Sequence, residues 1–180
     1  MKNMRDILLL PNFDNMDVIE KIRKDNDELY GIVPPHITIV FPFEDDMSDD
    51  ELVVKVRDYF KDKKKFYVKF SGVSFSDDNY IFLDCVEGKK DIIKIHDELY
   101  NNYFQKYLSD REYIPHITIG QTFNSSNEQL KKIENMKDEF ECYIDTIIIE
   151  KIGLNEESII LDKIVLGGKN ESINNNGNCS

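Results

Sequence analysis

The chain has 180 residues, of which 41% are hydrophobic and 32% are charged. A chain of this length and composition can bury a core without disulfides and is not disordered throughout. With 35 acidic against 23 basic residues its net charge is −12, which argues against a broad basic groove that follows a long nucleic acid. A small phosphorylated ligand or a single RNA end would need only a few local cations and is compatible with this charge.

The three cysteines are far apart in the sequence and form no Cys-x-x-Cys pair: Cys85, Cys142 and Cys179. An odd number of scattered cysteines favours reduced thiols. The first apolar run, residues 7–10, is too short for a signal sequence or a membrane span. We expect a cytoplasmic monomer with no membrane partner.

In the first half of the chain, apolar spacing and turn residues predict a strand, a helix, a histidine-bearing strand, a second helix and a third strand. These elements fall at residues 7–10, 14–27, 36–40, 48–63 and 66–75. Asp14 is the expected cap of the first helix, and Ser48-Asp49-Asp50-Glu51 is a capping box for the second.

The second half repeats this order and adds one strand. We expect strands at residues 80–86 and 116–119, helices at 91–107 and 125–137, and a final hairpin of strands at 140–152 and 159–166. The second helix of this half begins at the capping box Ser125-Ser126-Asn127-Glu128.

One pentapeptide, Pro-His-Ile-Thr-Ile, occurs at residues 35–39 and again at 115–119. An internal duplication explains both this recurrence and the repeated element order. We expect one bilobal domain over residues 1–166, with halves at about 6–75 and 80–166, followed by a disordered Asn-rich tail at 167–180. Related halves pack about a pseudo-twofold axis, which would bring the two histidine strands together.

The motif makes chemical sense on a strand. Residues i and i+2 point to the same face, so His36 and Thr38 point together, as do His116 and Thr118. Two such strands across a cleft surround one volume with two imidazoles and two hydroxyls. One neutral histidine can take a proton from the attacking group, and the other, protonated, can give one to the leaving oxygen of a phosphodiester. The hydroxyls can bind the non-bridging oxygens.

With these residues, the chain resembles the 2H phosphoesterase superfamily, which includes the bacterial RNA 2′-5′ ligase-like proteins. The resemblance rests on His36-Ile37-Thr38 and His116-Ile117-Thr118 and covers about residues 6–166 in element order. It implies a bilobal α+β fold with two mostly antiparallel sheets, flanking helices and a central cleft. It also implies catalysis without metal or cofactor, an acid–base pair of His36 and His116, and phosphate binding by Thr38 and Thr118.

The family's substrates are 2′,3′-cyclic phosphates, 2′-5′ linkages and related cyclic nucleotides. Ligase-like members often carry Arg three residues beyond the second motif threonine, where this chain has Gln121. Without that arginine the chain lacks a bidentate phosphate clamp, so the resemblance favours hydrolysis over RNA ligation. The ending His-Ile-Thr-Ile-Gly-Gln is more similar to the phosphoesterase branch of Bacillus-type bacteria.

Residues near the motifs are candidates for substrate binding: Phe41, Tyr113 and Gln121. The aromatic rings can stack on a base or belong to the core. His96, in the helix at 91–107, lies outside both motifs and is read as a helix residue without a catalytic role. The acidic run at residues 44–51 is read as loop and first-turn acids near a helix start, and we expect no metal site.

Three kinds of function remain open from the sequence. The first is a phosphodiesterase that acts on a 2′,3′-cyclic phosphate, a 2′-5′ linkage or a signalling cyclic nucleotide, with RNA ligation as a variant. The second is a nucleotide-binding sensor that does not turn its ligand over. The third is a purely structural or partner-binding domain, in which replacing His36 or His116 would change stability or association and no reaction. The sequence does not decide which histidine is the base, because the two groups can titrate as a coupled pair.

Overall fold

The computed structural model describes residues 4–167 and contains two four-stranded sheets that lie side by side. Sheet A has the order β2-β1-β7-β8 and sheet B the order β5-β4-β3-β6, and every strand pair is antiparallel. The strands of sheet A are β2 (Ile37–Glu44), β1 (Met4–Leu10), β7 (Thr146–Ile152) and β8 (Ser158–Val165). The strands of sheet B are β5 (His116–Gln121), β4 (Tyr80–Glu87), β3 (Phe66–Phe75) and β6 (Glu139–Ile144).

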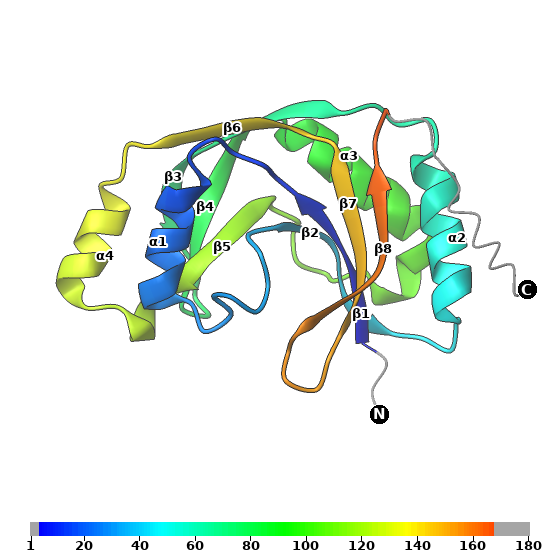
Figure 1. Cartoon of the computed structure of the whole chain (residues 1–180), viewed down its shortest axis with the longest axis horizontal. Helices are drawn as coiled ribbons and strands as arrows, with labels where there is room; N and C mark the ends of the chain where they lie inside the picture. Colours follow the sequence, from blue (N-terminus) through cyan, green and yellow to red (C-terminus); the bar gives the residue numbers. More distant parts are fainter. Residues whose placement is uncertain (1–3, 168–180) are drawn as a thin grey trace, which may run out of the picture.

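Helices flank both sheets (Figure 1). They are α1 (Met16–Asn26), α2 (Asp49–Phe60), α3 (Lys89–Leu99) and α4 (Asn127–Glu134). α1 and α4 lie with sheet B, and α2 and α3 lie with sheet A. This arrangement confirms the predicted fold class, an α+β bilobal structure with two antiparallel sheets. None of the described helices is long and apolar enough to cross a membrane.

Each lobe takes elements from both halves of the sequence. α1 follows β1 of sheet A yet packs on β5 of sheet B, and α3 follows β4 of sheet B yet packs on β2 of sheet A. In the same way β3, the last strand of the first half, joins sheet B beside β4. This exchange ties the lobes together through a continuous apolar core. The boundaries that we expect for the two halves remain predictions, and the expected tail beyond Gly167 lies outside the described residues.

The single strand predicted at residues 140–152 is wrong. The structure ends β6 at Ile144 and begins β7 at Thr146, and the two strands belong to different sheets. β6 pairs with β3 and β7 pairs with β1, so the chain crosses from one lobe to the other at the exposed Asp145 (Figure 1). The change of pairing partner leaves little trace in the apolar pattern, because only Asp145 separates the two strands in the sequence.

The helix predicted at residues 91–107 is α-helical only through Leu99. It continues as a π-helical turn, Tyr100–Phe104, and a 3-10 turn, Gln105–Tyr107. The wider turn keeps both Tyr100 and Phe104 buried, and the Tyr100 hydroxyl accepts a hydrogen bond of 3.1 Å from the Phe41 amide in β2. π turns often occur at functional sites, where they change which side of a helix faces inward.

The helix starts also differ in detail from the prediction. α1 begins after Asn15 rather than Asp14, and no side chain caps it. The capping box of α4 is formed by Ser126 and Gln129, one position later than expected. Ser125 is therefore free to donate a hydrogen bond of 2.5 Å to Asn26 at the end of α1. Ser48 caps α2 as predicted, accepting from the Glu51 amide.

Candidate active site

The two motifs have the same pattern of burial. In residues 35–39 and in residues 115–119, the proline and both isoleucines are buried, while the histidine and the threonine are partly exposed. This alternation places each histidine on the same side as its threonine, as the strand period predicts. His116 is the first residue of β5, whereas His36 lies one residue before β2 begins.

The motif strands are the two that bring the lobes together. β2 and β5 each stand at the end of their sheet, and they contact one another. The Tyr113 hydroxyl, just before the second motif, donates a hydrogen bond of 2.8 Å to the Thr38 carbonyl in the first. His36 is close enough to His116 that a charge on the His116 ring lowers the pKa of His36. The fold therefore unites four side chains from positions far apart in the sequence.

Both histidines are held in the same tautomer by the backbone. His36 Nδ1 lies 2.8 Å from the Pro34 carbonyl oxygen, and His116 Nδ1 lies 2.7 Å from the Ile114 carbonyl oxygen. A carbonyl only accepts, so in each ring Nδ1 carries the hydrogen and donates it. The neutral ring therefore has its free lone pair on Nε2, which is the atom that can take up or release a proton.

A cavity of about 1010 Å³ opens between the lobes beside the motifs. Thr38, His116 and Thr118 contribute to its wall, and His36 is not among the residues that line it. The rest of the wall comes from Phe41 in β2, the β3–β4 hairpin, the end of α3 with the π-helical turn after it, and the loop before β5. Acidic residues at the wall outnumber basic ones, since Arg111 is the single basic side chain there.

Both motif strands contain a bulge at the same place in the motif. Leu8 pairs with Thr38 and Ile7 with Val40, so β2 has an extra residue between them, Ile39. In β5, Thr118 pairs with Phe82 and Gly120 pairs with Ile81, so Ile119 is the corresponding extra residue. A bulge shifts the following residues to the opposite face. The third residue after each motif threonine, Phe41 or Gln121, is therefore turned to the face of the histidines.

The three candidates for substrate binding differ in their surroundings. Phe41 lines the cavity and is 43% exposed. Tyr113 also lines it, but its hydroxyl is bound to Thr38 and its ring stacks on His96 at 3.8 Å, so its contacts are structural. Gln121 is opposite Tyr80 in the sheet register, yet it is outside the cavity wall and accepts a hydrogen bond of 3.1 Å from Asn124. Of the three, Phe41 is the one best placed to meet a ligand.

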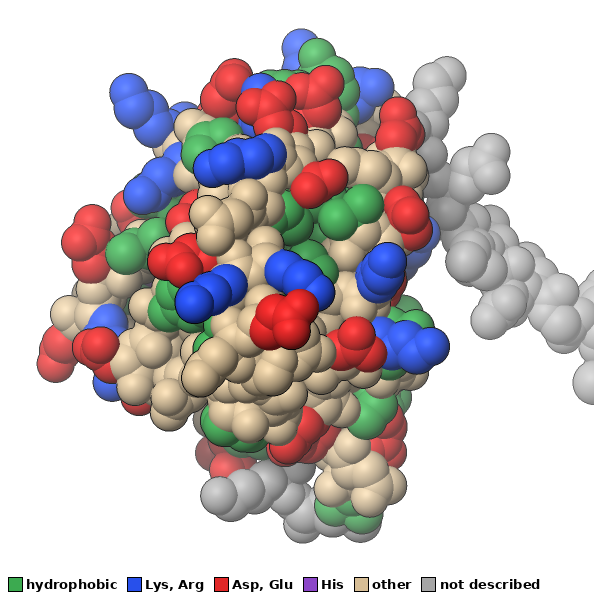
Figure 2. All heavy atoms as spheres, turned by 90° about the vertical axis from the view of Figure 1, so that its left-hand side faces the viewer, with side chains coloured by type: hydrophobic (Ala, Val, Ile, Leu, Met, Phe, Trp, Pro, Cys, Tyr) green, Lys and Arg blue, Asp and Glu red, His purple; other side chains and the backbone are tan. Residues whose placement is uncertain are grey.

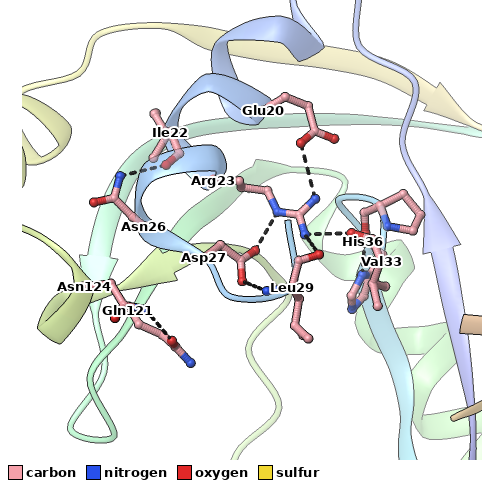
Figure 3. A network of polar contacts seen from close by, with 11 residues as sticks. Glu20, Ile22, Arg23, Asn26, Asp27, Leu29, Val33, His36, Gln121 and Asn124 are labelled. Carbon is pink, nitrogen blue, oxygen red and sulfur yellow. Dashed lines mark hydrogen bonds and ion pairs between the residues drawn. The ribbon is translucent and has the colours of Figure 1, made fainter. Parts of the chain in front are cut away.

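Sequence reasoning missed Arg23, which fixes the loop that leads to His36. Arg23 is 2% exposed. Its Nε donates to Asp27 at 2.7 Å, and its Nη2 donates at 2.7 Å to the carbonyl of Val33 and at 3.3 Å to that of Leu29 (Figure 3). The hydrogen bonds to Arg23 therefore hold in place the loop that leads to His36. The sequence did contain a sign of this buried arginine: Ile19 and Arg23 are four residues apart, a spacing that puts the arginine on the apolar side of α1.

Sequence reasoning also missed two neighbours of His116 in β4. The Phe82 ring packs on the His116 ring with centroids 3.8 Å apart. Asp84 is directly opposite His116 in the β4–β5 register. The signal was the alternation of β4, in which Tyr80, Phe82 and Asp84 occupy every second position and so share one face.

Charges and burial act on the two histidines in different ways. Burial is the main cause that lowers the pKa of both rings below the ordinary value of 6.5. For His36 the Arg23 guanidinium lowers the pKa further, while Asp27 opposes it. For His116 the Asp84 carboxylate raises the pKa against the effect of burial. Similar motifs therefore sit in unlike electrostatic surroundings.

His96 and the acidic run behave as side chains of the scaffold. His96 is 4% exposed, lies at the cavity wall and has its Nδ1 2.9 Å from Asp97. In the acidic run, Asp45 pairs with Lys106 and Asp49 with Lys151. Within residues 4–167, no three His, Cys, Asp or Glu side chains are grouped so that they could hold a metal ion.

Acidic and basic side chains are interspersed on the face formed by α1 and α4, and no continuous basic stripe is visible there (Figure 2). The cavity wall, with four carboxylates against Arg111, is likewise not basic. Neither surface has the form of a track for a long polyanion.

Solved structures from two bacteria share this fold. The Escherichia coli LigT structure complexed with 3′-AMP aligns with a TM-score of 0.62 and 11% identity, covering 93% of this chain and 100% of that one. TT0787 of Thermus thermophilus also aligns with a TM-score of 0.62 and 11% identity, covering 92% of this chain and 99% of that one. At such low identity these alignments show the fold alone, and they confirm the bilobal architecture.

Sequence comparison identifies the family. A protein named "Putative phosphoesterase" from Bacillus mycoides is 30% identical over 124 residues, 67% of this chain and 70% of its own length. One from Bacillus pumilus is 27% identical over 140 residues, 72% of this chain and 80% of its own length. The 2′-5′ RNA ligase superfamily profile matches residues 11–154, which include both motifs. The chain therefore belongs to the 2′-5′ RNA ligase superfamily, a family of 2H phosphoesterases.

Proposed function

We propose that the chain is a metal-independent phosphodiesterase in which His36 and His116 are the acid–base pair and Thr38 and Thr118 bind the phosphate. The observation that carries this proposal is the equivalence of the two motifs. Each histidine donates from Nδ1 to a carbonyl two residues earlier, which leaves Nε2 free, and each has a threonine on the same face.

The chemistry follows from these four groups. The neutral histidine takes a proton from water as the water oxygen attacks phosphorus, and the protonated histidine gives a proton to the leaving oxygen. Threonine hydroxyls donate hydrogen bonds to the non-bridging oxygens, where negative charge builds up. Nothing in this sequence of steps requires a metal ion or an organic cofactor.

The cavity favours a small nucleotide substrate with a single phosphodiester, either a 2′,3′-cyclic phosphate or a 2′-5′-linked or cyclic nucleotide. Its volume of about 1010 Å³ is at the upper end of the usual range for small-molecule pockets, so it is large enough for a mononucleotide or a dinucleotide. Exposed rings at its wall, Phe41, Phe75 and Tyr80, can stack on a base. The binding of 3′-AMP and ATP by Escherichia coli LigT agrees with a nucleotide ligand.

The test is an assay of the purified protein in EDTA against the four nucleoside 2′,3′-cyclic monophosphates, with 2′-5′-linked and cyclic dinucleotides as further substrates. His36→Ala and His116→Ala are each expected to lower kcat/KM by at least about 10²-fold. Thr38→Val and Thr118→Val are expected to weaken turnover, and Thr146→Val in β7 is the matched control because that hydroxyl bonds only to Asp145. Chromatography separates 2′- from 3′-phosphate products.

The outcomes separate the candidate functions. Turnover that both alanine variants abolish supports the two-histidine phosphodiesterase. Tight binding of a nucleotide without turnover supports the sensor, and unchanged turnover in either alanine variant contradicts the assignment. Activity lost in EDTA and restored by a divalent cation would contradict the metal-independent part. Formation of a 2′-5′ linkage from RNA ends would support ligation, which the glutamine at position 121 disfavours.

A further inference from the structure

Asp84 is fixed on the cavity face of sheet B directly across from His116. The two residues are register partners in the β4–β5 pair, and side chains in such positions have Cβ atoms about 4.5–5.5 Å apart. The Ser74 hydroxyl of β3 donates a hydrogen bond of 2.7 Å to Asp84 Oδ1, which restrains the carboxylate on that face. Both Ser74 and Asp84 line the cavity.

His36 has no corresponding carboxylate opposite it in the sheet. His36 comes just before the paired part of β2, whose first residue pair is Ile37 with Leu9. The charged groups that act on it are Arg23, Asp27 and His116. Arg23 and Asp27 are bound to one another at 2.7 Å, so their charges largely cancel at a distance.

The other charged groups around the cavity lie outside the β4–β5 strand pairing that sets Asp84 opposite His116. Asp77 and Asp78 are at the tip of the β3–β4 hairpin, and Arg111 and Glu112 are in the loop before β5. Arg111 pairs with Asp78 at 3.2 Å, and both are well exposed. Among these charged groups, Asp84 is the one whose carboxylate acts on His116.

We propose that Asp84 assigns the roles of the two histidines by keeping the proton on His116, which makes His116 the general acid and leaves His36 as the base. This inference rests on the proposed phosphodiesterase function. Asp84 is a positioning residue in this scheme, because it acts through His116 and touches no reacting atom.

The step is balanced as follows. His36 Nε2 takes a proton from water while the water oxygen forms a bond to phosphorus. The bond from phosphorus to the leaving oxygen breaks, and His116 Nε2–H gives its proton to that oxygen. The products are a phosphomonoester and a hydroxyl group, and solvent exchange returns one proton to His116 and removes one from His36. The oxygen that leaves is the one that faces His116.

The experiment compares the pH dependence of kcat/KM in the parent chain, Asp84→Asn and Asp77→Asn. Asparagine at position 84 keeps an oxygen that can accept from Ser74, so the change removes charge and little else. The descending limb of Asp84→Asn, which reports loss of the proton from the acid, is expected to move to lower pH by about 0.5–1 unit. Asp77→Asn removes the same charge from the same cavity and is expected to leave both limbs in place.

A second measurement does not depend on activity. NMR titration of the three histidine rings in the full chain is expected to show a lower midpoint for His116 in Asp84→Asn, with at most a small rise for His36, whose pKa the His116 charge lowers. An unchanged His116 midpoint overturns the inference even if the enzyme is active. A shift of the ascending limb instead of the descending one overturns the role assignment. If no substrate is turned over, the proposed function fails while the NMR result still decides whether Asp84 holds the proton on His116.

Discussion

Replacing Arg23 with methionine tests whether the interior of α1 controls the approach to His36. Methionine keeps much of the volume and removes the guanidinium. The Asp27 carboxylate, with a side-chain exposure of 7%, then loses its ion-pair partner, and the Val33 carbonyl loses a buried hydrogen bond of 2.7 Å. The Leu29 carbonyl keeps two backbone donors, the amides of Ile32 and Val33, so it adds little to the cost.

The expected cost is about 3 kcal/mol, at the lower end of the range for breaking a buried ion pair, because Asp27 keeps a hydrogen bond from the Leu29 amide. For a chain of this length that loss lowers Tm by roughly 6–12 °C. The matched control is Lys55→Met, which breaks an exposed pair with Glu51 on α2. A pair of that kind contributes about 0.3–0.5 kcal/mol.

The assays are urea unfolding and kcat/KM measured well below Tm. Since Arg23 holds the loop that carries the Pro34 carbonyl, we expect Arg23→Met to lower kcat/KM by about 10²-fold, as for a catalytic group displaced by about 1 Å. Lys55→Met should retain the parent rate. If Arg23→Met loses no more stability than Lys55→Met, the buried network does not carry the loop and the reasoning is refuted.

Three further predictions concern packing and titration. Gly120→Ala should cost about 1–3 kcal/mol in urea unfolding, because an added Cβ would lie 2.8 Å from the Asn26 Cβ; a loss below about 0.5 kcal/mol would contradict this close packing. Burial, reinforced by Glu150, raises the pKa of Asp6 to about 8, so the stability contributed by its neutral carboxyl is fully present below about pH 4 and is lost as pH rises towards 8. The gain in unfolding free energy from Asp6→Asn should therefore grow between pH 5 and pH 8, and an equal gain at both pH values would count against it. Since burial lowers the pKa of both motif histidines, kcat/KM should peak below pH 6.5, and a peak above pH 7.5 would exclude that environment.

Local patterns in the sequence determined most of the elements and the central motif. The strand period placed His36 with Thr38 and His116 with Thr118, and the repeated pentapeptide predicted that the two strands would meet. Both expectations depend on neighbours at i+2 and on the duplication, which are visible without coordinates. The apolar spacing of α1 and the Ser48 cap of α2 are local signals of the same kind.

Only the tertiary structure decided what surrounds each motif. Nothing in the sequence of β4 distinguishes Asp84 as functional, and it matters because the β4–β5 register places it opposite His116. The bulges at Ile39 and Ile119 turn the third residue after each threonine toward the histidine face, and no residue type in the sequence marks them.

The tertiary structure also decided where the chain crosses between the lobes. The crossover at Asp145 joins strands whose apolar patterns run on with little interruption, and the partner of each strand is chosen by long-range pairing. The sequence by itself therefore determined which residues could do chemistry, because side-chain type and local period are encoded along the chain. The structure decided how the two histidines differ, because burial, register and ion pairing depend on residues far away in the sequence.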